Sequence, residues 1–330
     1  MDIAKDGRLP HKIARRLRLP LIAAPMLAVS GPDLAIAASI NGVIGAFPVA
    51  NARTIETLDA WLTKIAGTLD RAAQENPDRP PAPFCPNLII KRAEMKAELA
   101  CLLRHRIEMV ITSVGSPAEA IGPLHDIGCT VFADVATIRH AEKALAVGVD
   151  GLVLLTAGAG GQTGWLNPLA FVRAARQMFD GPIVLAGGIS DGTTLWASQV
   201  LGCDLAYMGT KFIATNESMA PDAYKRMLVE SDMDDVMLTQ AFTGLDTNML
   251  TPSMIAAGLD PTTLPPRVSI EEAARNFGSK GEMTGPRRYK DIWSAGHSVS
   301  GVTRVQSTAE LIEQTLREYE EARNRTRVML

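Results

Sequence analysis

Short apolar segments recur along the first two-thirds of the chain, and longer segments of mixed polar and apolar positions separate them. Each apolar segment is rich in Val, Ile, Leu and Ala and lacks strict alternation, which predicts strands buried on both faces. There are eight of them: Leu21–Met26, Val43–Val49, Phe84–Ile90, Met109–Gly115, Thr130–Ala136, Gly151–Ala157, Pro182–Ile189 and Leu205–Ile213. The intervening segments predict amphipathic helices, among them Thr54–Thr68, Arg92–Arg106, Ala118–Ile127, Ile138–Val147, Pro168–Met178 and Gly192–Leu201.

Eight strand-helix units predict an α/β fold in which the strands close into a TIM (β/α)8 barrel. A doubly wound open sheet shows the same alternation and remains the alternative. Glycines at the ends of the last two predicted strands favour the barrel, because those two ends are neighbours there. Glycine lets the backbone approach an anion, and the dipole of a following helix favours negative charge. We therefore predict that one phosphate group is held by Gly187, Gly188, Gly209 and Thr210.

The chain has 330 residues, more than the ~250 of a typical barrel. The segment 217–285 contains helical patches, several prolines and no clear strand, which predicts a mainly helical insertion over the barrel mouth. A charged helix is predicted from Ser307 to about Arg325 and would close the barrel wall. The barrel domain would then comprise residues 1–216 and 286–330.

The composition of the chain limits the classes of partner that it can bind. A net charge of −3, with no basic cluster beyond Arg15-Arg16-Leu17-Arg18, argues against nucleic-acid binding. The apolar stretch Leu19–Val29 is too short to span a bilayer and contains two prolines, and the amino terminus lacks a signal-peptide layout. We expect a cytoplasmic protein that acts on a small molecule. Neither a disulfide framework nor a metal site is expected, because the four cysteines show no CxxC spacing: Cys85, Cys101, Cys129 and Cys203.

A third glycine-rich loop, Gly158–Trp165, follows the sixth predicted strand and ends at the helix start Asn167-Pro168. A flat aromatic ligand could lie close to its backbone, with Gln162 and Thr163 as polar side chains and Trp165 as a wall. A mobile lid that does not contact a ligand is the alternative.

These glycine-rich segments are part of an ordered series of motifs. The series is Ala24-Pro25-Met26, Asn87-Leu88, the Ala159–Gly164 loop, Ala186-Gly187-Gly188-Ile189 followed by Asp191-Gly192, the run from Met208-Gly209-Thr210 to Ser218, and Trp293-Ser294-Ala295-Gly296. It resembles the nitronate monooxygenase (2-nitropropane dioxygenase) family, together with related FMN-dependent NADH:quinone reductases and enoyl reductases. The resemblance covers nearly the whole chain.

The resemblance implies a TIM barrel with a helical insertion that binds FMN without a covalent bond, so the expected phosphate becomes that of FMN. Ala24, Pro25 and Met26 would lie beside the isoalloxazine, and Asn87 would bind its pyrimidine edge. The remaining cofactor contacts would come from Asp134, Ala159, Gly160, Gly161, Met208, Trp293 and Ser294, in addition to the four phosphate-binding residues. NADH or NADPH could serve as reductant, and a homodimer is among the assemblies that the resemblance allows.

Two inward candidates, Asp134 and Ser113, are placed by the predicted strands near the ribityl chain or the ring. An unpaired carboxylate at a flavin edge would disfavour the anionic reduced ring. We therefore expect Asp134 to pair with a cation such as Lys211 or Arg139.

Gln162 departs from the family pattern, in which this loop position normally carries histidine. An amide has no proton that titrates near pH 7, so it can orient a substrate but cannot act as a general base. A preformed nitronate is already an anion and needs no base. His297 directly follows the Trp293–Gly296 motif and is a candidate for the missing imidazole, acting from the opposite side of the flavin; an ordinary helix-start histidine is the alternative.

Three function classes remain open. The first is an FMN-dependent oxidoreductase, either a nitronate monooxygenase that uses O2 or an NAD(P)H-dependent reductase of a quinone or activated alkene. The predicted mouth residues Trp165, Phe47 and Tyr207 suit a flat or apolar substrate. The second is an FMN-binding protein of low turnover, because Gln162 replaces the family histidine. The third is a barrel that binds another phosphate ester, such as an isomerase or aldolase.

Overall fold

The structure is a computed structural model that describes residues 7–277 and 286–329. Parallel strands form a closed barrel in which β1 pairs with both β2 and β9. The eight barrel strands are β1 (Leu21–Ala23), β2 (Ile44–Pro48), β3 (Phe84–Ile89), β4 (Met109–Ser113), β5 (Thr130–Val135), β6 (Gly151–Leu155), β8 (Ile183–Ala186) and β9 (Leu205–Met208). The TIM barrel is therefore confirmed, and the open sheet is excluded.

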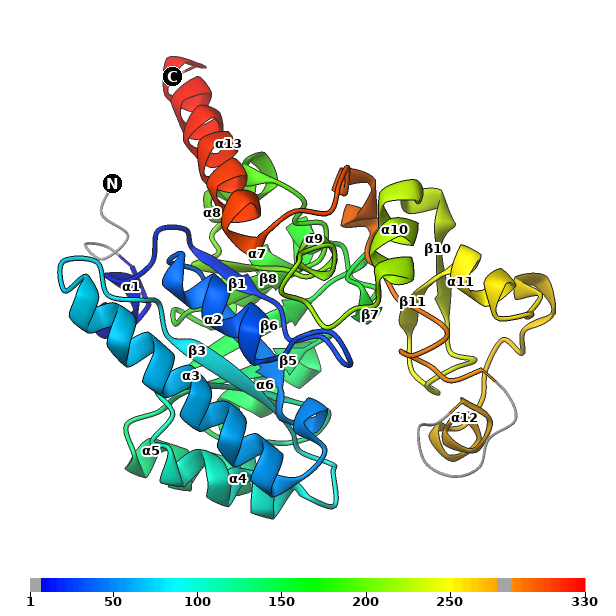
Figure 1. The fold of residues 1–330 in the computed structure, drawn as a ribbon, viewed down its shortest axis with the longest axis horizontal. Helices are drawn as coiled ribbons and strands as arrows, with labels where there is room; N and C mark the ends of the chain where they lie inside the picture. Colours follow the sequence, from blue (N-terminus) through cyan, green and yellow to red (C-terminus); the bar gives the residue numbers. More distant parts are fainter. Residues whose placement is uncertain (1–6, 278–285, 330) are drawn as a thin grey trace.

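Helices surround the barrel (Figure 1). They are α2 (Pro32–Ile40), α3 (Ile55–Glu75), α4 (Met95–Arg104), α5 (Ala118–Asp126), α6 (Ile138–Ala146), α7 (Pro168–Met178) and α8 (Gly192–Leu201). The carboxyl-terminal helix α13 (Thr308–Met329) packs against α8 and α2. The short helix α1 (His11–Ala14) covers the amino-terminal end of the barrel, where its side chains join the interior core.

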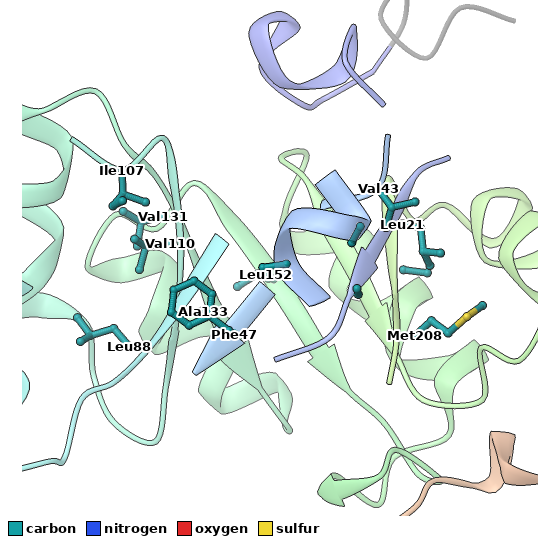
Figure 2. Packing of buried hydrophobic residues seen from close by; sticks show 14 of the residues in the cluster. Leu21, Val43, Phe47, Leu88, Ile107, Val110, Val131, Ala133, Leu152 and Met208 are labelled. Atoms are coloured by element: carbon teal, nitrogen blue, oxygen red, sulfur yellow. The ribbon is translucent and has the colours of Figure 1, made fainter. Parts of the chain in front are cut away.

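Side chains alternate between the barrel interior and the layer under the helices, as the pleat of a strand requires. The interior contains Ile22, Ile44, Cys85, Phe132 and Tyr207. The outer layer is shown in Figure 2, with Leu21, Val43, Leu88, Val110 and Leu152 among its members. Phe47 also belongs to this outer layer, where its ring contacts Trp61 of α3 at 5.9 Å between centroids. The prediction that Phe47 faces the barrel mouth is therefore wrong, because its neighbours Ala46 and Pro48, not Phe47, occupy the inward register.

The last predicted strand, Leu205–Ile213, is shorter than expected. The strand β9 ends at Met208, and the helix α9 (Thr210–Ile213) begins after Gly209. Gly209 therefore lies in a turn between strand and helix.

After α9 the chain forms helices and a small sheet, grouped on one side of the barrel (Figure 1). The helices are α10 (Asp222–Glu230), α11 (Thr251–Ala256) and α12 (Ile270–Phe277), and the strands are β10 (Val236–Thr239) and β11 (Thr247–Leu250). The prediction that this segment has no strand is wrong. Strand β11 also pairs with β7 (Gly161–Gln162), which lies in the loop after β6. The domain limits at residues 216 and 286 stay a prediction.

Short 3-10 helices complete the described part: η1 (Val49–Ala52), η2 (Met233–Asp235), η3 (Pro261–Thr263) and η4 (His297–Gly301). Within residues 7–277 and 286–329, no helix combines the length and the apolar character needed to cross a membrane.

Candidate functional site

Two glycine turns lie at the carboxyl ends of β8 and β9. Gly187 and Gly188 have φ angles of +132° and +76°, which L-residues rarely adopt. A β-carbon at position 187 would lie 2.4 Å from Thr156 Oγ1, whereas one at position 188 would meet no atom within 4 Å. Gly187 is therefore packed against the end of β6, and Gly188 borders open space at the barrel mouth.

These turns present unused hydrogen-bond donors. Among the described residues, the N–H groups of Gly188, Gly209 and Thr210 donate no hydrogen bond to the protein. The start of α8 differs, because Asp191 Oδ1 accepts from the Thr194 N–H at 2.7 Å and Glu318 Oε2 accepts from the Gly192 N–H at 3.0 Å. The two turns, and not the capped start of α8, can therefore receive an anion.

The turn after β1 lies beside the turn after β9. Ala24 donates from its N–H to Met208 O at 3.0 Å, and a β-carbon at Gly209 would lie 3.5 Å from Met26 Sδ. Pro25 lies between Ala24 and Met26. Asn51 and Ser30 hold this turn, through Asn51 Nδ2 to Met26 O at 2.9 Å and Met26 N to Ser30 Oγ at 3.0 Å. An apolar surface thus adjoins the unused donors.

The loop Gly158–Gly161 is packed between two other segments. On one side, the His297 N–H donates to Gly158 O at 2.9 Å, and a β-carbon at Gly160 would lie 2.7 Å from the Gly296 nitrogen. On the other side, Asn248 Nδ2 of β11 donates to Ala159 O at 2.7 Å. In the structure this loop is held by neighbours on both sides.

The segment 293–297 connects this loop to the β9 turn. The Gly296 N–H donates to Thr210 Oγ1 at 3.0 Å. Trp293 stacks on Tyr224 of α10, with ring centroids 4.9 Å apart, and the Tyr224 hydroxyl donates to Ser294 O. The structure therefore brings together the predicted cofactor residues that follow β1, β6, β8 and β9 and those near Trp293.

Asn87 and Ser113 lie on the neighbouring strands β3 and β4, and both side chains are buried. Ser113 Oγ donates to Asn87 Oδ1 at 3.2 Å, and Asn87 Nδ2 donates to Ile111 O at 3.4 Å. These two bonds fix the orientation of the amide. One N–H and one lone pair of the amide stay available for a ligand.

Asp134 on β5 is isolated. Its Oδ1 is enclosed without a hydrogen-bond partner among the described residues, and burial raises the pKa of this carboxyl to about 7. The expected pairing with Lys211 or Arg139 does not form. Lys211 instead has Glu318, Asp191 and Arg304 as its charged neighbours. Asp134 lies near Cys85 and Tyr207, which belong to the barrel interior. The hydroxyl of Tyr207 on β9 is also buried and, within the described part, without a partner.

The two candidate catalytic residues both adjoin the Gly158–Gly161 loop. Gln162 lies in β7, where its backbone is paired with Thr247, and its side chain is half-buried. His297 is exposed, and its Nδ1 would lie 2.8 Å from a β-carbon at Gly158. Trp165 is 73% exposed. Sequence reasoning missed Asn248 and Thr156, since neither lies in a motif.

A cavity of about 610 Å³ lies between α10, α11 and the segment that leads to Trp293. It is lined by Ala223, Met227, Ala256, Ala257, Pro286, Lys290, Asp291 and Trp293. Its walls are mostly small or apolar side chains, with one cation and one anion. The cavity therefore borders Trp293, the first residue of the segment 293–297, whose Gly296 contacts the glycine loop.

Three comparisons with known proteins extend this description. The (3aS,4S,5R,7aS)-5-hydroxy-7a-methyl-1-oxo-octahydro-1H-indene-4-carboxyl-CoA dehydrogenase of Mycobacterium tuberculosis is 25% identical over 72% of this chain, and the chain spans only 64% of that relative's length. The nitronate monooxygenase of Pseudomonas aeruginosa is 27% identical over 92% of this chain and 96% of that protein. FabK from Thermotoga maritima is 22% identical with a TM-score of 0.76, covering 95% of this chain and 96% of that chain, which supports the fold alone.

A family model described as nitronate monooxygenase matches residues 11–318. The match includes every barrel strand, the three glycine segments and the segment 293–297 that joins them. The chain therefore belongs to the nitronate monooxygenase family.

Proposed function

We propose that the chain binds FMN at the carboxyl ends of its barrel strands and uses it to oxidise alkyl nitronates with O2. The observation that carries this proposal is the set of unused N–H donors at Gly188, Gly209 and Thr210, which lie at the ends of two adjacent strands. Such donors suit a phosphate. FMN, when bound, would supply the electron acceptor for the reaction.

The surroundings of these donors fit the rest of FMN. The turn Ala24–Met26 offers an apolar surface to a flat ring, and Asn87 offers a fixed amide to its polar edge. The enclosed Oδ1 of Asp134 is the one polar atom of this set that lacks a protein partner, so a ligand atom would complete its hydrogen bonding. A carboxyl with a pKa of about 7 can donate or accept at neutral pH.

Gln162 and His297 have different roles in this proposal. Gln162 orients the nitronate through its amide and removes no proton, since the substrate is already an anion. His297, on the other side of the Gly158–Gly161 loop, supplies the only imidazole proposed for the site and stabilises the anionic substrate by donating a hydrogen bond to it.

The test is an anaerobic rapid-mixing measurement of the flavin absorbance of FMN-loaded protein. The protein is mixed separately with propyl-2-nitronate, NADH and NADPH. Bleaching by the nitronate alone supports the proposal. The variant His297→Gln should bleach more slowly with the nitronate, and an unchanged rate would remove His297 from the mechanism.

A second candidate is an NAD(P)H-dependent reductase of a quinone or activated alkene. The open hollow of about 610 Å³ beside Trp293 favours it, because it leaves room for a ligand larger than a short alkyl nitronate. The Mycobacterium tuberculosis relative is named as a dehydrogenase of a CoA compound, which points in the same direction. Fast bleaching by NADH or NADPH would favour this candidate. If none of the three reagents bleaches the flavin, the result would favour an FMN-binding protein of low turnover.

A further inference from the structure

Three side chains with metal-binding atoms meet on the outer wall of the barrel, between two of its helices. Asp59 comes from α3, Cys101 from α4, and His105 from the residue that ends α4. Their ligand atoms all lie within 4.8 Å of one another. The helices α3 and α4 pack against each other (Figure 1), so this cluster lies in a helix-helix contact.

The spacing of the cluster follows from helix geometry. Cys101 and His105 are four residues apart and therefore lie on one face of the helix end. Asp59 Oδ1 lies 2.9 Å from His105 Nε2 and 3.8 Å from Cys101 Sγ. Cys101 is fully buried, whereas the side chains of His105 and Asp59 are 19% and 48% exposed. One side of the cluster is thus fixed by packing and the other is open to water.

The two distances from Asp59 Oδ1 are close to those of a tetrahedral zinc site, and the distance between His105 Nε2 and Cys101 Sγ is at most 4.8 Å. Ordinary Zn–N, Zn–O and Zn–S bonds place oxygen and nitrogen ligands about 3.4 Å apart, and oxygen and sulfur ligands about 3.6 Å apart. The Oδ1–Sγ distance already agrees. The Oδ1–Nε2 distance must open by only a few tenths of an ångström, which a half-exposed aspartate allows.

We propose that Asp59, Cys101 and His105 form a three-ligand site for Zn²⁺ or a similar thiolate-binding divalent cation, with water as the fourth ligand. A thiolate and an imidazole select such ions over Mg²⁺ and Ca²⁺. On binding, the Cys101 thiol releases its proton to solvent. The ion fastens α4 to α3. The sequence expectation of no metal site missed this cluster because Asp59 lies 42 residues before Cys101.

Arg104 competes with the cation. Its Nη2 lies 3.3 Å from Asp59 Oδ1, and its side chain is 57% exposed, so it can move into solvent when a metal ion binds. Because two cations repel each other, removal of the guanidinium should strengthen metal binding.

The test uses the untagged full chain, freed of metal with a chelator and titrated with Zn²⁺ alone. One equivalent should bind and raise the melting temperature. Titration with Co²⁺ should produce the charge-transfer absorption of a cobalt thiolate. Cys101→Ser should weaken Zn²⁺ binding at least ~10-fold and abolish that absorption, whereas Cys203→Ser, which removes another buried cysteine, should change neither.

Two further variants separate the metal site from a simple hydrogen bond between helices. His105→Gln keeps a polar group and should also weaken Zn²⁺ binding, and it replaces Cys101→Ser if that variant does not fold. Arg104→Ala should bind Zn²⁺ several-fold more tightly. The proposal is overturned if no stoichiometric Zn²⁺ binds, or if Cys101→Ser and Cys203→Ser bind it equally.

Discussion

At the scale of single residues, Gly188 and Gly128 form a matched pair. Both have a φ angle of +76°, and a β-carbon at either position would meet no atom within 4 Å. Gly188 borders the barrel mouth, whereas Gly128 follows α5 and receives a hydrogen bond from Lys12 at the opposite end of the barrel. Both positions therefore require the same left-handed backbone conformation, but only Gly188 lies near the proposed ligand site.

We predict that Gly188→Ala weakens FMN binding at least tenfold, because its methyl group would occupy the approach to the unused N–H donors. A left-handed conformation costs an L-residue about 1–2 kcal/mol, so Gly188→Ala and Gly128→Ala should lose similar free energy of unfolding. Titration of the apoproteins with FMN, followed by flavin fluorescence, measures the affinity, and urea denaturation measures the stability. Equal FMN affinities in the two variants would contradict the phosphate assignment.

The raised pKa of Asp134 predicts a pH-dependent stability. The folded apoprotein keeps the proton of this carboxyl up to about pH 7, whereas the unfolded chain loses it near the ordinary value of 3.8. The contribution of this proton to the free energy of unfolding is fully present below about pH 4. It decreases by about 1.4 kcal/mol per pH unit as the pH rises toward 7.

Asp134→Asn removes this dependence, because an amide does not titrate. Urea denaturation of both apoproteins across this pH range should show the variant gaining stability relative to the parent as the pH rises. Parallel stability curves would show that the carboxyl is already solvated in the folded protein.

The glycine turns could be predicted at this scale, because their residue type reflects the backbone that they must adopt. The isolation of Asp134 could not. Arg139 lies in the helix that follows the strand of Asp134, and Lys211 follows the last barrel strand. A predicted order of strands and helices does not give the direction of a side chain, and Asp134 Oδ1 has no partner among the described residues.

At the scale of elements, the loop after β6 and the segment 293–297 are joined backbone to backbone. A β-carbon at Gly160 would lie 2.7 Å from the Gly296 nitrogen and 3.0 Å from the Ala295 carbonyl carbon. No side-chain rotation can relieve such contacts, so the two segments must separate if position 160 gains a methyl group.

We therefore predict that Gly160→Ala breaks the hydrogen bond from Gly296 to Thr210 and lowers FMN affinity. Limited proteolysis of the apoprotein should show new cleavage in residues 293–297. The control is Gly122→Ala, since Gly122 lies inside α5 with no atom within 4 Å of a β-carbon, and alanine should stabilise the helix there by about 1 kcal/mol. Unchanged proteolysis in Gly160→Ala would mean that the two segments adapt without separating.

The barrel strands could be predicted as elements because each is a short, mostly apolar run. The strands β10 and β11 could not, because each has four residues and their pairing depends on a third strand of two residues from another part of the chain. Helix α2 is also hard to predict from the sequence. It is rich in alanine and apolar at most positions, so it lacks the amphipathic pattern that marks α3.

At the scale of the whole molecule, the mouth is assembled from segments that are far apart in the sequence. The loop after β6, strand β11 and the segment 293–297 contact one another through Asn248, Gly160 and Gly296. A ligand that binds only the folded mouth should therefore stabilise all three segments together.

We predict that FMN slows amide hydrogen exchange in concert at residues 158–163, 247–250 and 293–297. Residues 9–17, which cover the amino-terminal end of the barrel, serve as the internal reference and should change little. Protection limited to the turns after β8 and β9 would show that the loop and the small sheet respond independently of the phosphate site.

The sequence predicted the closed barrel at this scale, with an open sheet as the alternative, because eight buried strand-helix units leave few other arrangements. It did not determine how the segment after α9 attaches to the mouth. That attachment is made by β7, which has only two residues and pairs with β11.

In strand β7, the position of residue 162 depends on its backbone, whereas its chemistry depends on its side chain. The Gln162 backbone is held by its pairing with Thr247, while the described structure gives its side chain no hydrogen bond that maintains the loop. A single codon change at this position can thus exchange an amide for an imidazole and leave the scaffold in place. Because the backbone pairing holds residue 162 in place, its side chain can change during evolution. The reactivity of the chain can then diverge while its fold is conserved.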